Sequence, residues 1–301
     1  MSEYSITSFF SGAGLGDKGI VDAGVRINQS FEMDANAVKT YNANFDHQIS
    51  ETDITKTLVL EQTKSEGMVF SYPCTRYSNM ANLHGTQTGD DLYLHALRFL
   101  AIARPEFYAV ENVVGLKYFK IVMEAMTKMS DYYVQIFCPV ESSIFVPQRR
   151  DRLVILATKK YFNFRPPENL KPVSLASILE KNPQISIPKS VYTRLDGGYR
   201  DLPIISDPRK GDIAPCCLAH YGKDRGTRLV VDTNFPRNVR PYTVREYARL
   251  QGLEDSFVFP VCDTEAFKQI GNGITRHVGI WIGTEFKRYM SQGRRIASNL
   301  S

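Results

Sequence analysis

Along residues 5–158, short apolar runs rich in β-branched and aromatic residues, typical of strands, alternate with segments whose apolar residues are spaced as in helices. Such alternation requires crossover connections, so it predicts an α/β fold with a mostly parallel sheet and helices on both faces. The predicted strands are 5–10, 27–33, 68–72, 107–112, 132–139 and 153–158, and the predicted helices are 16–23, 35–45, 92–103 and 121–128.

The pattern changes between Lys181 and Arg240. This segment is rich in Pro and Gly and poor in helical periodicity, which predicts a small, irregular module with short strands. It holds eleven Lys and Arg against six Asp, so the difference accounts for the whole net charge of +5. A basic, irregular segment is often only a solvated surface, and the alternative is a face that contacts nucleic-acid phosphates.

Length and composition are those of a globular enzyme. The 301 residues are 43% hydrophobic and 11% aromatic, which is enough for one large domain and a small appendage. No apolar stretch approaches the length of a membrane span, and residues 1–6 lack the basic and apolar regions of a signal peptide. We therefore expect a cytoplasmic protein that does not act at a membrane.

The spacing of cysteine and histidine gives no sign of a metal site. The five cysteines are odd in number and lack Cys-x-x-Cys spacing, and the five histidines are scattered. Neither a disulfide framework nor a zinc site is predicted.

The tripeptide Tyr72-Pro73-Cys74 follows the apolar run 67–71. Proline cannot donate to a β-ladder, so the strand stops there and Cys74 is expected at the carboxyl edge of the sheet, where ligands bind. A second apolar strand, residues 107–113, carries Glu111 near its end, which places a carboxylate at the same edge. The pair favours a nucleophilic role for Cys74, with a small buried structural cysteine as the alternative.

A glycine-rich turn joins the first predicted strand to the first predicted helix. Gly12, Gly14 and Gly16 allow a ligand to approach closely and permit backbone conformations barred to other residues. Glu32 ends the second strand, where its carboxylate can accept both ribose hydroxyls of an adenosine. The turn lacks the Gly-x-Gly-x-x-Gly spacing of dinucleotide-binding proteins, but these two features alone suit a nicotinamide cofactor equally well.

The Pro-Cys and Glu-Asn-Val pair resembles the DNA (cytosine-5) methyltransferases. Eight short motifs occur in that family's order and at compatible spacings over nearly the whole chain. They are Phe-Ser-Gly-Ala-Gly (10–14), Glu-Met-Asp (32–34), Asp-Ile (53–54), Pro-Cys (73–74), Glu-Asn-Val (111–113), Gln-Arg-Arg-Asp-Arg (148–152), Arg-Glu-Tyr-Ala-Arg-Leu-Gln-Gly (245–252) and Gly-Asn-Gly-Ile (271–274).

The resemblance implies the Rossmann-like fold of S-adenosylmethionine-dependent methyltransferases, with a small, irregular β-rich target-recognition domain. We expect a catalytic domain at 1–175, the target-recognition domain at 176–240, and a C-terminal segment at 241–301 that completes the catalytic domain. The implied activity is transfer of a methyl group from S-adenosylmethionine to carbon 5 of a flipped-out cytosine in double-stranded DNA, with S-adenosylhomocysteine as the product.

The family's chemistry implies roles for the catalytic residues. The Cys74 thiolate, favoured by charge from Arg152 or Arg76, would attack carbon 6 of the ring and form a transient adduct. A protonated Glu111 would stabilise charge at ring nitrogen 3, and the Arg152 guanidinium would stabilise charge at oxygen 2. Arg150 would support Glu111 or the backbone. The base that removes the proton from carbon 5 is not assigned.

The resemblance also implies a cofactor pocket. Phe10 would stack near the adenine, Glu32 would hold the ribose, and Asp53 would accept from the adenine amino group. A turn residue or helix cap is the alternative for Asp53. The expected cofactor-binding residues are Phe10, Gly12, Ala13, Gly14, Glu32, Met33, Asp53, Ile54, Pro73, Asn272 and Ile274, of which the last two would close the pocket from the C-terminal segment.

Two segments are expected to contact DNA. Arg76 and Ser78 would bind phosphates beside the flipped base, and residues 79–91 would form a closing loop, with an ordinary surface loop as the alternative. In the target-recognition domain, the candidates flank glycines where the backbone can approach a groove. They are Arg194, Arg200, Arg225 and Arg228.

Three positions depart from the family pattern. Thr75 replaces the usual glutamine, Leu15 occupies a common glycine position, and Thr275-Arg276 stands where proline is frequent. None of these changes removes a group that makes or breaks bonds. The target-recognition segment is short for the family. We therefore expect it to read few bases, or to be complemented by a partner or a second protomer.

The resulting interpretation is a DNA (cytosine-5) methyltransferase in a bacterial restriction-modification or phage-related setting, with a cognate restriction endonuclease or a second protomer as partner. Three alternatives stay open: a tRNA methyltransferase of the same fold, a catalytically silent DNA-binding subunit, and a nicotinamide oxidoreductase. Intact Cys74, Glu111 and Arg152 argue against the silent subunit. Hydride transfer requires neither the Pro-Cys nor the Glu-Asn-Val motif.

Overall fold

The computed structural model describes residues 4–47, 49–59, 64–73, 92–198, 200–201 and 203–298, with residues 293–298 described by their backbone alone. Its contacts divide the chain into two compact units. The first consists of Met1–Val140, Asp151–Pro167 and Ile274–Ser301, and the second of Glu141–Arg150 and Glu168–Gly273. The C-terminal return to the first unit therefore begins at Ile274, whereas the sequence placed it at residue 241.

A seven-stranded sheet forms the centre of the first unit, in the order β3-β2-β1-β4-β5-β7-β6. β1 pairs in parallel with β2 and β4, and parallel pairs also join β2 to β3 and β4 to β5, whereas β7 runs antiparallel to β5. The predicted mostly parallel α/β sheet is thus confirmed. The strands are β1 (Ser5–Phe9), β2 (Arg26–Glu32), β3 (Ser50–Glu51), β4 (Gly67–Phe70), β5 (Phe107–Val113), β6 (Tyr133–Glu141) and β7 (Asp151–Thr158).

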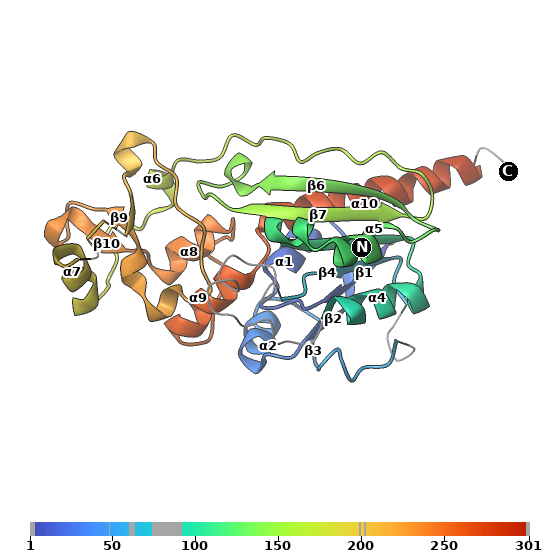
Figure 1. Cartoon of the computed structure of the whole chain (residues 1–301), viewed down its shortest axis with the longest axis horizontal. Helices are drawn as coiled ribbons and strands as arrows, with labels where there is room; N and C mark the ends of the chain where they lie inside the picture. The colour runs from blue at the N-terminus through green and yellow to red at the C-terminus, as the bar shows by residue number, and fades with distance from the viewer. Residues whose placement is uncertain are drawn as a thin grey trace. The chain divides into compact units, whose positions relative to one another are not determined.

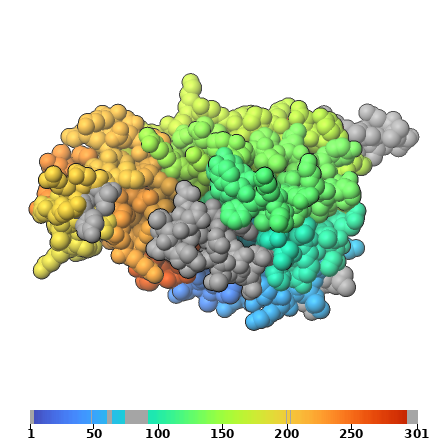
Figure 2. Space-filling model, viewed as in Figure 1, coloured from blue at the N-terminus to red at the C-terminus, as the bar shows by residue number. Residues whose placement is uncertain are grey.

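Helices cover both faces of this sheet (Figure 1). On one face, α4 contributes Phe99 and Leu100 to a buried cluster that also contains Phe9 and Phe70 from the central strands. On the other face, α1 and α10 pack so closely that a side chain at Gly279 would overlap the carbonyl of Gly16. Figure 2 shows α4 (teal) and α5 (green) at the surface. The helices are α1 (Leu15–Asp22), α2 (Ala35–Asn42), α4 (Leu92–Ala103), α5 (Lys120–Thr127) and α10 (Arg276–Ser298), with a 3-10 turn η2 (Val114–Tyr118).

Every strand and helix predicted between residues 5 and 158 is present, with ends shifted by a few residues. The sequence missed β3, which has only two residues and so gives no periodic signal. Among the helices of the described part of the chain, none is long and apolar enough to cross a membrane.

The second unit combines a three-stranded sheet, in the order β10-β9-β8, with helices and irregular turns. The short strands match the sequence prediction. Its core is aromatic: the rings of Tyr221 and Tyr247 stack at 4.5 Å, and Phe267 meets Tyr247 edge-on at 5.1 Å. The elements are η3 (Ser142–Ile144), α6 (Leu175–Ile178), α7 (Lys189–Asp196), β8 (Ile204–Ser206), η4 (Pro208–Lys210), η5 (Tyr221–Lys223), η6 (Arg225–Thr227), β9 (Arg228–Val231), η7 (Pro236–Asn238), β10 (Val239–Pro241), α8 (Val244–Leu250) and α9 (Asp263–Asn272).

Candidate active site

The ends of neighbouring strands bring the sequence-predicted residues of the first unit to one edge of the sheet. β1 leads into the turn at 10–14, β2 ends at Glu32, β4 leads toward Pro73, and β5 carries Glu111 near its carboxyl end. Because β7 is antiparallel to β5, its first residues, including Arg152, lie at this same edge. The carboxyl edge of a parallel sheet is where α/β proteins bind ligands, and this edge is the candidate active site.

Glu111 and Arg152 form an ion pair at the site. The Nε atom of Arg152 lies 3.0 Å from Oε1 of Glu111, and the two side chains are only 13% and 8% exposed. Arg152 also donates from Nη1 to the carbonyl of Asp151. A carboxyl group and a guanidinium held together at low exposure can present a hydrogen-bond acceptor or acid and a cationic donor to one ligand.

Asn112 fixes the backbone that leads to the expected nucleophile. Its side-chain Nδ2 donates to the carbonyl of Tyr72 over 3.1 Å, and its Oδ1 accepts from the amide of Val113 over 2.9 Å. Tyr72 is buried, and only Pro73 separates it from Cys74. The sequence places Asn112 in the Glu-Asn-Val motif without indicating a role for it. The signal is that Asn112, like Glu111, is a polar residue near the end of a strand whose other residues are apolar.

The expected nucleophile, Cys74, lies outside the described part of the chain. So do Arg76 and Ser78, expected to bind phosphates beside the flipped base, and residues 79–91, the expected closing loop. Their roles stay predictions.

The turn after β1 has the left-handed backbone that the glycines predicted. Gly12 and Gly14 have φ angles of 57° and 86°, and a Cβ at Gly14 would lie 2.5 Å from the Phe45 ring. Phe10, which is not a glycine, also has a φ of 58°. Such a conformation costs about 1–3 kcal/mol and persists only where the surroundings hold it. Here Ser71 Oγ donates to the carbonyl of Phe10 over 3.1 Å. Ala13 is buried.

Glu32 is held by backbone amides at the end of β2. Its Oε2 accepts from the amide of Gly12 over 2.9 Å, and its Oε1 accepts from the amides of Met33 and Asp34 over 2.8 and 2.9 Å. The carboxylate is therefore oriented beside the glycine turn. Met33 is 68% exposed, which leaves an apolar side chain in solvent next to this carboxylate.

Asp53 forms a turn with Thr55. A turn residue is the alternative to adenine binding that the sequence left open for Asp53. Its Oδ1 accepts from the amide and the hydroxyl of Thr55 over 3.0 and 2.7 Å, and these hydrogen bonds lower the pKa of Asp53 below its usual value. Oδ2 lies 3.4 Å from Nζ of the exposed Lys56. The next residue, Ile54, is buried. The adenine contact of Asp53 remains a prediction.

The two C-terminal residues expected in the cofactor pocket belong to different units. Asn272 is exposed at the end of α9 in the second unit. Ile274 begins the return to the first unit, where it is 8% exposed, and a Cβ at Gly16 would lie 3.0 Å from its side chain. Ile274 therefore packs against the start of α1, directly after the glycine turn.

Arg150 has backbone partners within the second unit. Its guanidinium donates to the carbonyls of Cys217, Gly271 and Gly273, at distances from 2.7 to 3.3 Å, and it is 3% exposed. The sequence left open whether Arg150 supports Glu111 or the backbone, and these contacts favour the backbone. Arg150 thus holds the end of α9.

Two glutamines join three of the motifs within the second unit. Gln148 accepts from the amide of Cys217 and donates to the carbonyl of Leu250. Gln251 donates to the carbonyls of Ile270 and Gly273, the second of which lies in the 271–274 motif. A side chain at Gly271 would overlap the backbone of Ala219, so this motif requires glycine. These contacts explain why residues 241–273 and 141–150 belong to the second unit.

Three of the four arginines expected to contact DNA are half-buried and held by contacts within the protein. Arg194 pairs with Asp224 over 2.5 Å, Arg228 donates to the carbonyl of Cys216 over 3.0 Å, and Arg225 donates to the carbonyl of Tyr242 over 3.1 Å. These contacts favour structural roles for all three.

Arg200 is different, since its side chain is 73% exposed and its ion pair, over 3.6 Å, is with Asp201, which is 90% exposed.

Within the 181–240 segment, the ion pairs are made by arginines and the segment's own aspartates, which leaves its excess of cations in place. Five of its arginines pair with carboxylates, namely Arg194, Arg200, Arg209, Arg237 and Arg240. Within the part of the chain that the structure describes, its exposed lysines enter no ion pair. These are Lys181, Lys189, Lys210 and Lys223.

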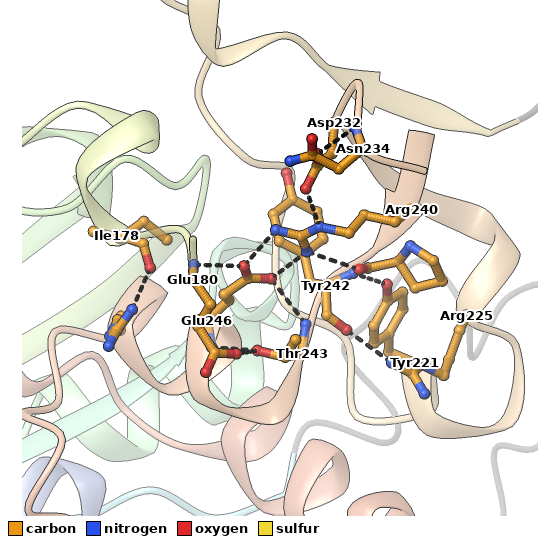
Figure 3. A network of polar contacts seen from close by, with 12 residues as sticks. Ile178, Glu180, Tyr221, Arg225, Asp232, Asn234, Arg240, Tyr242, Thr243 and Glu246 are labelled. Carbon is orange, nitrogen blue, oxygen red and sulfur yellow. Dashed lines mark hydrogen bonds and ion pairs between the residues drawn. The ribbon is translucent and has the colours of Figure 1, made fainter. Parts of the chain in front are cut away.

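A buried ion pair that the sequence did not indicate organises the second unit (Figure 3). Arg240, fully buried, donates to Glu246 through Nη1 and Nη2 over 2.8 and 2.7 Å and to Asp232 through Nε over 2.7 Å. Burial alone would lower the pKa of Arg240, but these two carboxylates raise it above its usual value. Glu246 also accepts from the amides of Glu180 and Thr243, so it ties β10 to α8 and to the segment after α6.

Among the residues that the structure describes, no group of three or more His, Cys, Asp or Glu is placed to hold a metal ion.

Comparisons with known proteins identify relatives over nearly the whole chain. The family model for C-5 cytosine-specific DNA methylases matches residues 4–288. The Type II methyltransferase M1.ScrFI of Lactococcus lactis is 29% identical over 81% of this chain and 68% of its own length. The Type II methyltransferase M.HpaII of Haemophilus parainfluenzae is 28% identical over 90% of this chain and 86% of its own length.

Solved structures share the fold. An Entamoeba histolytica methyltransferase, EhMeth, superposes with a TM-score of 0.77 at 20% identity and covers 94% of this chain and 97% of its own. A putative DNA modification methyltransferase encoded within a prophage of E. coli gives a TM-score of 0.72 at 20% identity, over 96% of this chain and 100% of its own. With a family model that spans all the motifs and a fold that agrees with it, this chain belongs to the C-5 cytosine-specific DNA methylase family.

Proposed function

We propose that this protein transfers a methyl group from S-adenosylmethionine to carbon 5 of a flipped-out cytosine in duplex DNA, through a covalent adduct of Cys74. Membership in the family makes it a DNA (cytosine-5) methyltransferase. The observation that carries the detailed proposal is the Glu111–Arg152 pair, held at the same sheet edge as the Asn112-anchored strand that leads into Cys74.

Carbon 5 of cytosine is a weak nucleophile, so the enzyme must add electron density to the ring. Attack of the Cys74 thiolate on carbon 6 forms a carbon–sulfur bond and moves negative charge toward nitrogen 3 and oxygen 2. Glu111, protonated when the base is bound, donates to nitrogen 3, and Arg152 donates to oxygen 2. The contact between the two side chains supports this proposal, because it holds both donors where one ring could receive them at nitrogen 3 and oxygen 2. Carbon 5 would then bond to the methyl group supplied by S-adenosylmethionine, whose carbon–sulfur bond to that methyl breaks. Loss of the carbon 5 proton finally allows the thiolate to leave.

The residues around the glycine turn fit S-adenosylmethionine, which supplies an electrophilic methyl group when bound. Glu32 is oriented by three backbone amides, as a carboxylate that receives ribose hydroxyls must be. Met33, exposed beside it, offers an apolar surface for adenine, and Phe10 is held in a strained conformation at the start of the turn. Strain of this kind is typical of ligand-binding turns.

DNA binding is proposed to use exposed cations of the second unit together with Arg76 and Ser78. Arg200 and the exposed lysines Lys181, Lys189, Lys210 and Lys223 are suited to phosphates. We propose a modification role beside a restriction endonuclease, since the named relatives are Type II methyltransferases.

Transfer of labelled methyl from S-adenosylmethionine tests the proposal. We expect incorporation into duplex DNA at cytosine carbon 5 and none into tRNA. Methylation sequencing of DNA from cells that express the protein would give the recognised sequence. Incorporation into tRNA alone would replace the DNA substrate with an RNA substrate, and no incorporation into either nucleic acid would contradict the proposal.

A further inference from the structure

A buried carboxylate lies under the glycine turn, where none of the proposed catalytic or cofactor contacts uses it. Asp17, on α1, is 4% exposed. Its Oδ1 accepts from the hydroxyl of Ser8 over 2.7 Å, and its Oδ2 accepts from the hydroxyls of Tyr41 and Ser30 over 2.9 and 3.3 Å. His47 Nε2 lies 3.0 Å from the hydroxyl of Tyr41. We call Ser8, Asp17, Ser30 and Tyr41 the Asp17 cluster.

The cluster contacts the turn at two points. The hydroxyl of Ser11, the residue after Phe10, donates to Oγ of Ser8 over 2.9 Å. The Tyr41 ring packs beneath Gly14, where an added Cβ would lie 2.8 Å from it. Both ends of the turn therefore rest on side chains that hydrogen-bond to Asp17.

The carboxylate gives these hydrogen bonds one direction. An ionised carboxylate only accepts, so the single hydroxyl proton of Ser8 points to Asp17 and the Ser8 oxygen is left to accept from Ser11. Without that acceptor, Ser8 could donate to Ser11 instead, and the turn would lose a defined arrangement. The cluster carries a cost, because burial raises the pKa of Asp17 despite its three hydroxyl donors. An apolar residue would fill the same space without this cost.

We propose that Asp17 is a positioning residue for cofactor binding: through Ser8 and Ser11 it holds the 10–14 turn, including the left-handed Phe10, in the conformation that receives the cofactor. The inference rests on the proposed cofactor site. Asp17 would touch no cofactor atom, because it acts on the shape that the turn has before the cofactor binds.

Isothermal titration calorimetry with S-adenosylhomocysteine tests the proposal on the full chain. We expect Asp17→Asn and Ser8→Ala to raise the dissociation constant by about tenfold. Ser8→Ala removes the link between Ser11 and Asp17, and an amide at residue 17 can accept through one of its two positions only, so either Ser8 or Tyr41 loses its acceptor. In methylation assays the KM for S-adenosylmethionine should rise while kcat stays within about twofold of wild type, because the reacting groups are untouched.

Asp22→Asn is the matched control. Asp22 lies on the same helix and forms ion pairs with Lys18 and Arg276, neither of which belongs to the 10–14 turn. The Asp22→Asn variant should therefore have lower thermal stability and an unchanged dissociation constant for S-adenosylhomocysteine. If the affinity of all three variants fell in proportion to their melting temperature, or if Asp17→Asn and Ser8→Ala bound like wild type, the positioning role would be overturned. Should Asp17→Asn fail to fold, Ser8→Ala and Ser11→Ala decide the question. Wild type that does not bind S-adenosylhomocysteine would refute the cofactor assignment itself, and the inference with it.

Discussion

The guanidinium of Arg152 contacts the carboxylate of Glu111, with 3.0 Å between Nε and Oε1, because β7 runs antiparallel to β5 and begins where β5 ends. The opposite end of the same two strands carries a second ion pair, Glu106 with Lys159 over 3.4 Å. Two acid–base pairs of similar chemistry thus cap one pair of strands, and only the first lies at the carboxyl edge of the sheet. This arrangement provides a control within the protein for the first prediction.

Arg152→Lys is expected to lower kcat by about a hundredfold, because a lysine keeps the charge but cannot present the planar donors of guanidinium to both Glu111 and the base. Affinity for S-adenosylhomocysteine should not change. Single-turnover methylation and calorimetry measure the two quantities. Glu106→Gln, at the far end of β5, should leave kcat as in wild type. If kcat fell equally in Glu106→Gln, the loss in Arg152→Lys would be due to a disturbed strand pair and not to the missing contact with the base.

Cys74→Ser is expected to abolish methylation with little change in cofactor binding, because a hydroxyl is a far weaker nucleophile than a thiolate. Duplex DNA with 5-fluorocytosine at the target should trap an adduct that survives denaturation, in wild type only. Absence of any adduct with wild type, on DNA that is known to be methylated, would remove Cys74 from the mechanism.

Glu32→Ala is expected to weaken S-adenosylhomocysteine binding by about 1–3 kcal/mol, since the ribose loses its acceptor and three backbone amides lose theirs. Glu32→Gln should weaken binding less, because the amide oxygen can still accept. Calorimetry gives both values. Unchanged affinity in Glu32→Ala, together with tight binding of a nicotinamide dinucleotide, would overturn the cofactor assignment.

Arg200→Ala should weaken binding to all duplexes alike and reduce the slope of log affinity against log salt by about one, as expected when one phosphate contact is lost. Arg225→Ala should instead lower stability, since its guanidinium donates to the carbonyl of Tyr242 and lies 5.4 Å from the Phe267 ring centroid. Fluorescence anisotropy at several salt concentrations and thermal melting separate the two effects. A flattened salt slope in a stable Arg225→Ala would favour the DNA contact predicted from the sequence.

Arg240→Met is expected to destabilise the protein by about 3–5 kcal/mol, because it leaves the carboxylate of Glu246 buried without a cation. Adding Glu246→Gln should recover part of the loss, since a neutral amide is less costly to bury. Urea denaturation measures the difference. Arg237→Met removes an exposed pair with Asp196 and should cost no more than about 1 kcal/mol. A similar small cost at Arg240 would mean that the buried pair does not organise the second unit.

Local pattern was sufficient for the helices and for every strand except the two-residue β3 between residues 5 and 158, and for the residues at the strand ends. Period-two and helical spacing depend on which face of an element is buried, and that information lies within a few neighbouring residues. The glycine turn and Glu32 were predictable for the same reason, because both follow directly from where a strand stops.

The contacts of charged side chains were decided by the tertiary structure. The sequence placed Glu111 and Arg152 in motifs, but their contact depends on the direction and register of β7. Counting cations could not separate Arg200, which is exposed, from Arg225, which bonds to the backbone. Asp17 gave no signal, since an acid in the first turn of a helix is usually solvated, and only the packing of α1 over Ser8 and Tyr41 buries it. Burial and partner choice depend on residues far apart in sequence, so a one-dimensional pattern does not contain them.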